Sequence, residues 1–293
     1  MCKIVLIGCG NVGISYAYSL INQYIEIDEL ILIDINEDKV LGKVLDLNHA
    51  LPYSPNSDIR IRVGTYNDCT DADIIVLTAG VNRKIGDTRL DLIQKNREIF
   101  KSIVKKVMDK GFEGIFIVAT NPVDIMTKLV LDYSKLDSSR VIGTGTLLDT
   151  ARLKSIIGEK LNIKATDIDI YVLGEHGDSS FVVWSSGNIS SLVDDKEQIE
   201  QLVRDSGQEI IKRKGMTEFG IGMALAKITD AIVNDLNVIL PVSTLDKDNN
   251  VCISTPSVIN RNGAYKTDLL LSKEEQEKYN NSINILREAS KDL

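Results

Sequence analysis

The segment VNRKIGDTR, residues 81–89, combines side chains that could bind an anionic substrate. Arg83, Lys84 and Arg89 are cationic, Asp87 is the single acid, and Gly86 is a natural flexing point. An arginine binds a carboxylate or a developing oxyanion with a planar pair of hydrogen bonds. The segment therefore predicts a loop in which one arginine contacts the reacting oxygen of a substrate and the other reads its far end.

A histidine and a spaced Asp/Arg pair could add acid/base chemistry. His176 ends a predicted strand in VLGEHGDSS, and Asp149 and Arg152 are three positions apart in LLDTARLK, on one face of a predicted helix. An aspartate bonded to an imidazole orients the ring and raises its pKa, and an arginine can grip a carboxylate. On spacing alone, a routine surface ion pair between Asp149 and Arg152 is the favoured interpretation, and a lone histidine is usually structural. The second histidine, His49, lies on an amphipathic stretch and is interpreted as structural.

Three glycines predict a phosphate-binding turn. Gly8, Gly10 and Gly13 form GCGNVG between the apolar run KIVLI and a helical pattern. A tight turn, a bare backbone and a helix N-terminus together favour a pyrophosphate. Asp34 ends ELILID, 21 positions after Gly13, where a carboxylate accepts ribose hydroxyls and repels a 2′-phosphate. The pattern predicts NAD rather than NADP; the alternative is an ordinary tight strand–helix turn.

The elements that would position these residues form two units. Up to about residue 143, β-branched runs alternate with helical periods, which predicts an α/β doubly wound parallel sheet, the Rossmann fold, over residues 1–143. Residues 144–293 predict a mixed α+β substrate domain, with a helix over about 146–161, a strand in DIDIYVLG, two long helices, shorter strands and a closing helix from about 273 to 289. Since no Pro/Gly/Ser linker separates the units, we expect them to pack tightly.

Composition excludes several classes of protein. The chain has 293 residues, 43% of them hydrophobic and 26% charged, with a net charge of −8 that disfavours nucleic-acid binding. Its four cysteines form no CxxC and no His/Cys cluster, which indicates reduced thiols and no metal site. KIVLIG lacks the flanks of a signal peptide, and no apolar run reaches membrane-spanning length. We expect a soluble, cytoplasmic protein without a membrane partner.

Along nearly its whole length the chain resembles the NAD-dependent lactate/malate dehydrogenase family, and most of all its bacterial lactate-type members. The resemblance rests on GCGNVG, TAG at 78–80, GDTRLDLIQKN, ATNPVD, GTGTLLDTARL, GEHGD and KRKGMT, in this order. It implies an NAD-dependent oxidoreductase that interconverts pyruvate and L-lactate. It also implies a small-molecule 2-oxo or 2-hydroxy acid as the partner, and assembly as a homotetramer or homodimer.

The resemblance assigns roles to matching residues. His176 would be the proton donor and acceptor, Asp149 its orienting partner and Arg152 the carboxylate clamp. Arg89 would polarise the carbonyl, Asn121 would lie by the nicotinamide, and Thr217 would line the pocket. The implied cofactor-binding residues are Gly8, Gly10, Asn11, Val12, Gly13, Asp34, Tyr66, Thr78, Ala79, Gly80, Thr120 and Asn121.

Signals for the substrate conflict. Arg83 falls where malate-type relatives have arginine and lactate-type relatives usually have glutamine. A buried guanidinium without an anionic partner is costly. Oxaloacetate would supply that partner, whereas pyruvate would not unless Asp87 neutralised Arg83. GEHGD, GTGTLLDTARL and Thr217 resemble the lactate branch. Gly207, where alanine is frequent in the family, leaves room for a bulkier 2-oxo acid. Lactate-type activity is favoured, with malate-type and bulkier substrates as alternatives.

A non-catalytic NAD-binding sensor is the rival class of protein. It would need only the glycines and Asp34, and would leave Arg89, Arg152 and His176 unexplained.

Activation by a sugar bisphosphate is not expected. Lys154 and Asp169 stand where relatives activated by fructose 1,6-bisphosphate have arginine and histidine. An aspartate repels a phosphate, so we expect no such activation.

Overall fold

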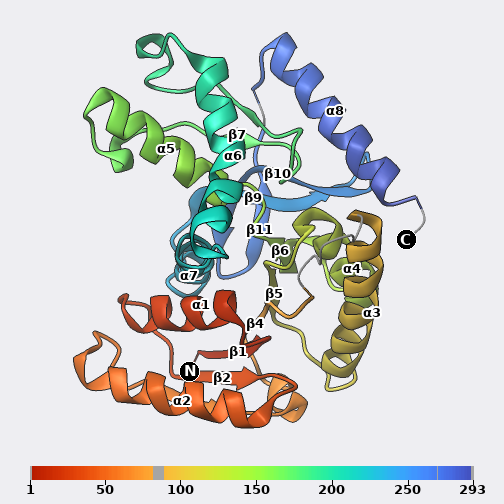
Figure 1. Ribbon diagram of the computed structural model, residues 1–293. Helices are drawn as coiled ribbons and strands as arrows, with labels where there is room; N and C mark the ends of the chain where they lie inside the picture. Colours follow the sequence, from red (N-terminus) through yellow and green to blue (C-terminus); the bar gives the residue numbers. More distant parts are fainter. Residues whose placement is uncertain (1, 82–88, 269, 292–293) are drawn as a thin grey trace.

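The computed structural model describes residues 2–81, 89–268 and 270–291, without the side chains of residues 89–91. In this part of the chain, nine strands form one sheet in the order β11-β10-β9-β6-β5-β4-β1-β2-β3. Figure 1 shows α1 and α2 at one end of the molecule and α5 and α6 at the other. The strands are β1 Lys3–Ile7, β2 Glu29–Ile33, β3 Arg60–Val63, β4 Ile74–Leu77, β5 Ile115–Val118, β6 Val141–Gly143, β7 Val172–Leu173, β8 Phe181–Val182, β9 Val238–Asp246, β10 Val251–Asn260 and β11 Gly263–Lys266. The helices are α1 Asn11–Ile21, α2 Glu37–Ala50, α3 Arg89–Met108, α4 Val123–Ser134, α5 Leu147–Leu161, α6 Lys196–Lys214, α7 Phe219–Val233 and α8 Lys273–Ala289.

The first six strands of the chain are parallel and confirm the predicted doubly wound sheet. β1 pairs with β2 on one side and β4 on the other, so the strand order reverses beside β1. Successive side chains of a strand point to opposite faces. In β1, Ile4 and Leu6 join a core with α1, α2 and α7, whereas Val5 and Ile7 join a core with α3, α4 and α8. Burying each such side chain contributes roughly 1.5–3 kcal/mol, which explains why these strands are apolar on both faces.

The second half adds strands to the same sheet. β9 and β10 form a long antiparallel ladder, and β9 meets β6 at a single residue pair, Gly143 with Ser243. They are the strands expected in the second unit, and with 9 and 10 residues they are shorter than the helices α6 and α7 that precede them. Within DIDIYVLG only Val172–Leu173 forms a strand, which pairs with β8. A third apolar core joins α5, α6, β7 and β8.

The two halves pack against each other through helices. α7 lies beside α1, and the buried hydroxyls of Tyr16 and Thr229 are 2.9 Å apart across that contact. The helices expected over 146–161 and 273–289 are α5 and α8. None of the helices in the described ranges is long and apolar enough to cross a membrane.

Candidate active site

A cleft of about 700 Å³ opens at the carboxyl ends of β1, β2 and β4. Ligands of open α/β sheets bind where the strand order reverses, and this cleft lies there. Of the expected cofactor-binding residues, it is lined by Gly8, Gly10, Asp34, Tyr66, Thr78, Ala79 and Gly80. Its other lining residues are Ile7, Ile33, Ile35, Val81, Glu98, Ile99, Ser102, Ile103 and Lys106.

Two of the three glycines of GCGNVG have a steric reason. Gly8 has φ +98°, and a Cβ there would lie 2.2 Å from the amide nitrogen of Ala79. A Cβ on Gly13 would lie 2.2 Å from the carbonyl oxygen of Gly8. Gly10 is different, because a Cβ there would meet nothing within 4 Å. It precedes α1, whose first N–H groups, from Asn11 and Val12 on, receive no side-chain cap from it, so they can bind a phosphate.

The carboxylate of Asp34 is held at the end of β2. Its Oδ2 accepts a 2.6 Å hydrogen bond from the backbone N–H of Cys9, and its Oδ1 accepts a longer one from that of Asn36. The charge is thereby fixed at the wall of the cleft. A phosphate beside it would be repelled, which favours a ribose with free hydroxyls.

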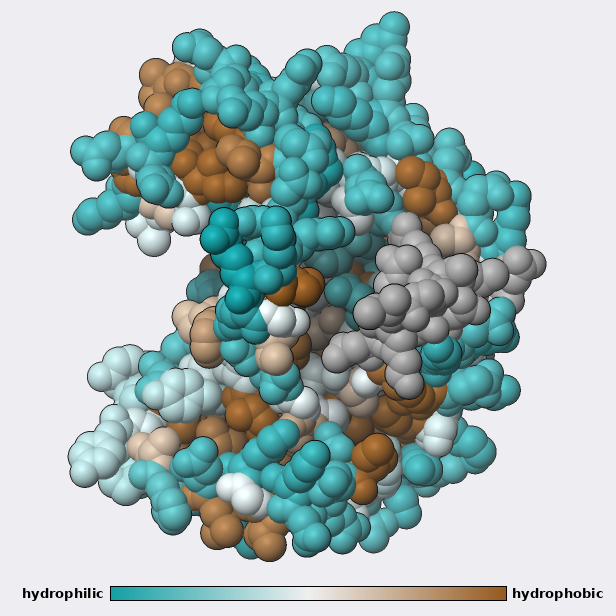
Figure 2. Space-filling model, in the orientation of Figure 1, coloured by the Kyte–Doolittle hydropathy of each residue, from teal (hydrophilic) through white to brown (hydrophobic). Residues whose placement is uncertain are grey.

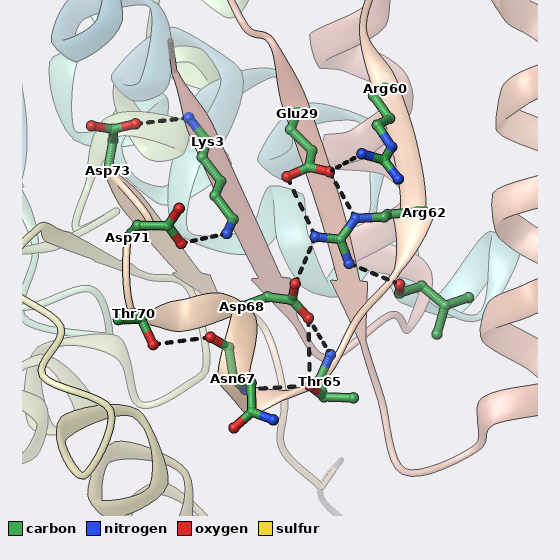
Figure 3. A network of polar contacts seen from close by, with 11 residues as sticks. Lys3, Glu29, Arg60, Arg62, Thr65, Asn67, Asp68, Thr70, Asp71 and Asp73 are labelled. Atoms are coloured by element: carbon green, nitrogen blue, oxygen red, sulfur yellow. Dashed lines mark hydrogen bonds and ion pairs between the residues drawn. The ribbon is translucent and has the colours of Figure 1, made fainter.

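A polar network that sequence reasoning missed holds the short helix Tyr66–Cys69 at the sheet edge (Figure 3). Arg62 of β3 donates to Glu29 at 2.7 Å and to Asp68 at 2.6 Å. Asp68 and Thr65 form a capping box around the short helix Tyr66–Cys69. Because Arg62 contacts both the neighbouring strand and this helix, the helix that begins at Tyr66 is anchored to the sheet edge.

Asn96 joins the two segments that contain TAG and ATNP. Its fully buried side chain accepts a 2.9 Å hydrogen bond from the N–H of Val81 and donates one of 3.0 Å to the carbonyl of Asn121. Thr120 also donates its hydroxyl to the carbonyl of Ala79, at 2.7 Å. Asn121, which is exposed, is thereby linked to a residue of the cleft wall.

The structure brings His176, Asp149 and Arg152 together. The Nδ1 of His176 lies 2.6 Å from Oδ2 of Asp149, and Nη1 of Arg152 donates to the other carboxylate oxygen at 2.8 Å. Asp149 stands in the first turn of α5 and is buried, while a quarter of the His176 side chain remains exposed. The aspartate therefore fixes the ring through Nδ1, so that Nε2 is the ring nitrogen that can take part in proton transfer.

Charge in this cluster controls the histidine. The negative charge of Asp149 raises the pKa of His176 to about 9, against the opposing effect of burial. Burial alone would raise the pKa of Asp149, but His176 and Arg152 hold it below its ordinary value. The pair is therefore an imidazolium and a carboxylate at neutral pH.

A second aspartate binds the backbone N–H of the same histidine. Asp124, in the first turn of α4, accepts a 2.8 Å hydrogen bond from the N–H of His176 and a 2.6 Å hydrogen bond from the hydroxyl of Ser243. It is buried, and this burial raises its pKa to about 6. The motif ATNPVD contains it, but its partner Ser243 is 119 positions away in the chain, so local sequence offered no signal for the contact.

Gly207 and Thr217 lie on the segments around the arginine. A Cβ on Gly207 of α6 would lie 3.4 Å from Nη2 of Arg152, so the glycine leaves one face of the guanidinium uncovered. Thr217 is half-buried between α6 and α7. His49 is exposed in the last turn of α2.

The arginines of the 81–89 segment stay predictions. Arg83, Lys84, Gly86 and Asp87 lie outside the described residues, and Arg89 is the first residue of α3, without a described side chain. Within the described ranges, no three His, Cys, Asp or Glu side chains gather in a group that could hold a metal ion.

Comparisons with known proteins agree over the whole chain. The family profile for the lactate/malate dehydrogenase NAD binding domain matches residues 2–143, and that for the alpha/beta C-terminal domain matches residues 146–293. The L-lactate dehydrogenase of Halalkalibacterium halodurans is 49% identical, over 98% of this chain and 96% of its own. That of Corynebacterium jeikeium is 46% identical, over 97% and 92%. Among solved structures, the minor L-lactate dehydrogenase of Enterococcus mundtii is 39% identical and superposes with a TM-score of 0.95, over 100% of this chain and 98% of its own. A lactate dehydrogenase from a Medee basin deep-sea metagenome library is 44% identical, with a TM-score of 0.94 and coverage of 99% and 98%.

Proposed function

Because the chain belongs to the lactate/malate dehydrogenase family, we propose that it is an NAD-dependent L-lactate dehydrogenase. It interconverts pyruvate and L-lactate. The observation that supports this most directly is the cluster of His176, Asp149 and Arg152, with contacts of 2.6 and 2.8 Å. A protein that only binds NAD would not need a buried aspartate that contacts both an imidazolium and a guanidinium.

The residues of the cleft fit the dinucleotide. Gly10 leaves the start of α1 open to a pyrophosphate, and Asp34 presents a fixed carboxylate to a ribose. When bound, the cofactor would supply a hydride as NADH in the reduction and accept a hydride as NAD+ in the oxidation. The hydrogen bonds of Asn96 connect this cleft to Asn121, three positions before the Asp124 that holds His176.

In reduction, His176 gives the proton on Nε2 to the carbonyl oxygen of pyruvate. Asp149 keeps the ring protonated beforehand and stabilises its orientation. Arg152 binds the substrate carboxylate, using donors that the contact with Asp149 leaves available, because a guanidinium has five N–H groups. Arg89 polarises the carbonyl, where negative charge develops, and this role rests on the family motif.

A bulkier 2-oxo acid is the second candidate substrate, and Gly207 is the observation that favours it. An alanine at this position would bring a methyl group within 3.4 Å of the carboxylate-binding guanidinium; the glycine leaves that space open. We therefore expect Gly207→Ala to lower kcat/KM for 2-oxoisocaproate more than for pyruvate. The malate-type alternative depends on Arg83, outside the described residues.

The test is a comparison of kcat/KM for pyruvate, oxaloacetate and 2-oxoisocaproate, followed by NADH absorbance. We expect pyruvate to be preferred and His176→Asn to abolish turnover. A preference for oxaloacetate that Arg83→Gln removes would favour the malate-type activity instead. NADH binding without turnover of any 2-oxo acid would leave only the sensor.

We also propose that the protein is a homotetramer in the cytoplasm. Figure 2 shows a broad hollow between the part with α1 and α2 and the part with α5 and α6. Large apolar side chains are exposed on α1, α2 and α7, namely Tyr18, Leu41, Leu45, Phe219 and Met223, and such patches favour association. All four cysteines are free thiols, as is usual in a reducing compartment. Sedimentation analysis distinguishes a tetramer from a dimer or a monomer.

A further inference from the structure

Two buried carboxylates hold His176, and the acid/base mechanism uses one of them. Asp149 binds the ring through Nδ1, whereas Asp124 binds the main chain through the N–H of the same residue. We propose that Asp124 is a positioning residue for the reaction: together with Ser243 it fixes the backbone from which the catalytic imidazole projects. The proposal rests on the proposed function, because it concerns the same proton transfer.

The geometry around Asp124 is that of an anchor. Each of its two carboxylate oxygens accepts a hydrogen bond, one from the N–H of His176 at 2.8 Å and the other from the hydroxyl of Ser243 at 2.6 Å. These partners come from the loop after β7 and from β9, while Asp124 itself is on α4. Three segments of the chain therefore meet at one buried carboxylate. A shift of the loop would break a charge-assisted hydrogen bond in a dry environment, which is strongly unfavourable.

This anchor also links the histidine to the cofactor side of the site. Asn121, expected beside the nicotinamide, precedes Asp124 by three positions, and its carbonyl is fixed by Asn96. The start of α4 thus determines where both His176 and Asn121 lie. A displacement of about 1 Å between reacting groups is enough to lower turnover strongly.

Keeping an ionised carboxylate here is costly for the fold, which argues against a purely structural role. Burial raises the pKa of Asp124 to about 6, although both hydrogen bonds and the charge of His176 oppose this. In return, the charge of Asp124 contributes to the raised pKa of His176. The ionisable groups that face the pair are Asp149 and Arg152 of α5, Glu175 of the same loop, Cys252 of β10 and Tyr279 of α8. Burial raises the pKa values of Cys252 and Tyr279, so both stay neutral near pH 7.

Two substitutions distinguish the effect of the hydrogen bonds of Asp124 from the effect of its negative charge. Asp124→Asn keeps an oxygen for the N–H of His176, and its amide can donate to Ser243, so mainly the charge is lost. Asp124→Ala removes both. We expect kcat for pyruvate to fall at least about tenfold in Asp124→Ala and less in Asp124→Asn, while KM for pyruvate and the Kd for NADH stay within about threefold. Because the lost charge was buried, Tm of Asp124→Asn should not fall.

The matched control is Thr244→Val. Thr244 neighbours Ser243 on β9, is also buried, and pairs with Thr255 instead of Asp124. We expect it to leave kcat unchanged, whereas Ser243→Ala should lower kcat by leaving an oxygen of Asp124 unpaired. Equal losses of kcat in Thr244→Val and Ser243→Ala would overturn the proposal, since they would reflect only the packing of β9.

A readout independent of turnover completes the test. The chain has two histidines, so an NMR titration of the imidazole signals, with His49→Gln for assignment, reports His176 directly. Asp124→Asn should lower the pKa of His176, and the alkaline limb of the pyruvate kcat/KM profile should shift the same way. An unchanged titration together with unchanged kcat in Asp124→Ala would overturn the inference and leave the proposed function intact. If the wild-type protein reduced no 2-oxo acid, the proposed function would fail, while the titration would still decide whether Asp124 acts on His176.

Discussion

Replacing Asp149 by asparagine should change the pH dependence of catalysis as well as its rate. Asp149 is the largest cause of the rise in the pKa of His176 from 6.5 to about 9. At 1.36 kcal/mol for each pKa unit, the surroundings favour the imidazolium by about 3 kcal/mol. Since three quarters of the side chain is buried, little of this interaction is lost to solvent screening. Without the carboxylate, burial pushes the pKa to its ordinary value or lower.

The consequence for rate follows from the protonated fraction. Pyruvate reduction needs the imidazolium, so wild-type kcat/KM should stay level through neutral pH and fall as the pH rises through about 9. Lactate oxidation needs the neutral ring and should rise over the same range. In Asp149→Asn, about one tenth or less of the histidine is protonated at about pH 7.5. Reduction should therefore fall at least about tenfold there from protonation alone, and by a smaller factor near pH 6.

The assay is the pH profile of kcat/KM for pyruvate, from about pH 6 to about pH 10, followed by NADH absorbance. Asp109→Asn is the matched control, because Asp109 pairs with Lys105 on the exposed end of α3. Loss of orientation would lower the rate equally at every pH, whereas loss of the imidazolium lowers it most at high pH. A constant ratio of variant to wild type across the range would refute the electrostatic reasoning.

Three further predictions follow from single side chains. Arg152→Lys should lower kcat/KM for pyruvate by roughly ten- to a hundredfold, since a lysine cannot form the paired hydrogen bonds of a guanidinium to a carboxylate; a loss below threefold would contradict the clamp. Asp34→Ser should raise the ratio of NADPH to NADH efficiency, measured as kcat/KM for each cofactor, by removing the carboxylate held by Cys9; an unchanged ratio would show that other residues select the cofactor. Fructose 1,6-bisphosphate should not lower the half-saturating pyruvate concentration, because Lys154 lies over the ring of Tyr171 at 5.8 Å with Asp169 close by; activation in a titration would disprove it.

The parts of the fold that depend on neighbours in the chain could be predicted from the sequence. GCGNVG and Asp34 lie within one strand–helix–strand unit, where steric rules for glycine and the pattern of apolar residues act locally. The cleft found at Gly8, Gly10 and Asp34 agrees with that pattern. By contrast, spacing could not distinguish Asp149 and Arg152 from a surface ion pair. Only the family motifs connected them to His176.

Contacts between distant segments could not be predicted. Ser243 reaches Asp124 because β9 joins the parallel sheet beside β6 through one residue pair, and nothing in either local sequence encodes that pairing. DIDIYVLG alternates like a strand, yet Asp169 gives its N–H to the side chain of Asn188 and most of the segment stays irregular. The alternation of apolar and polar residues indicates which side chains are buried. It does not indicate which backbone groups are available as hydrogen-bond partners.

The edge of the sheet also has a protective consequence. In the described part of the chain β3 is the outermost strand on its side, and an unpaired edge can template the addition of strands from other molecules. β3 is only four residues long and includes Arg60 and Arg62, both paired with Glu29. Such charges disfavour pairing with a strand of another molecule, and this lowers the tendency to aggregate. The same ion pairs, drawn in Figure 3, also hold the helix that carries Tyr66 at the wall of the cleft.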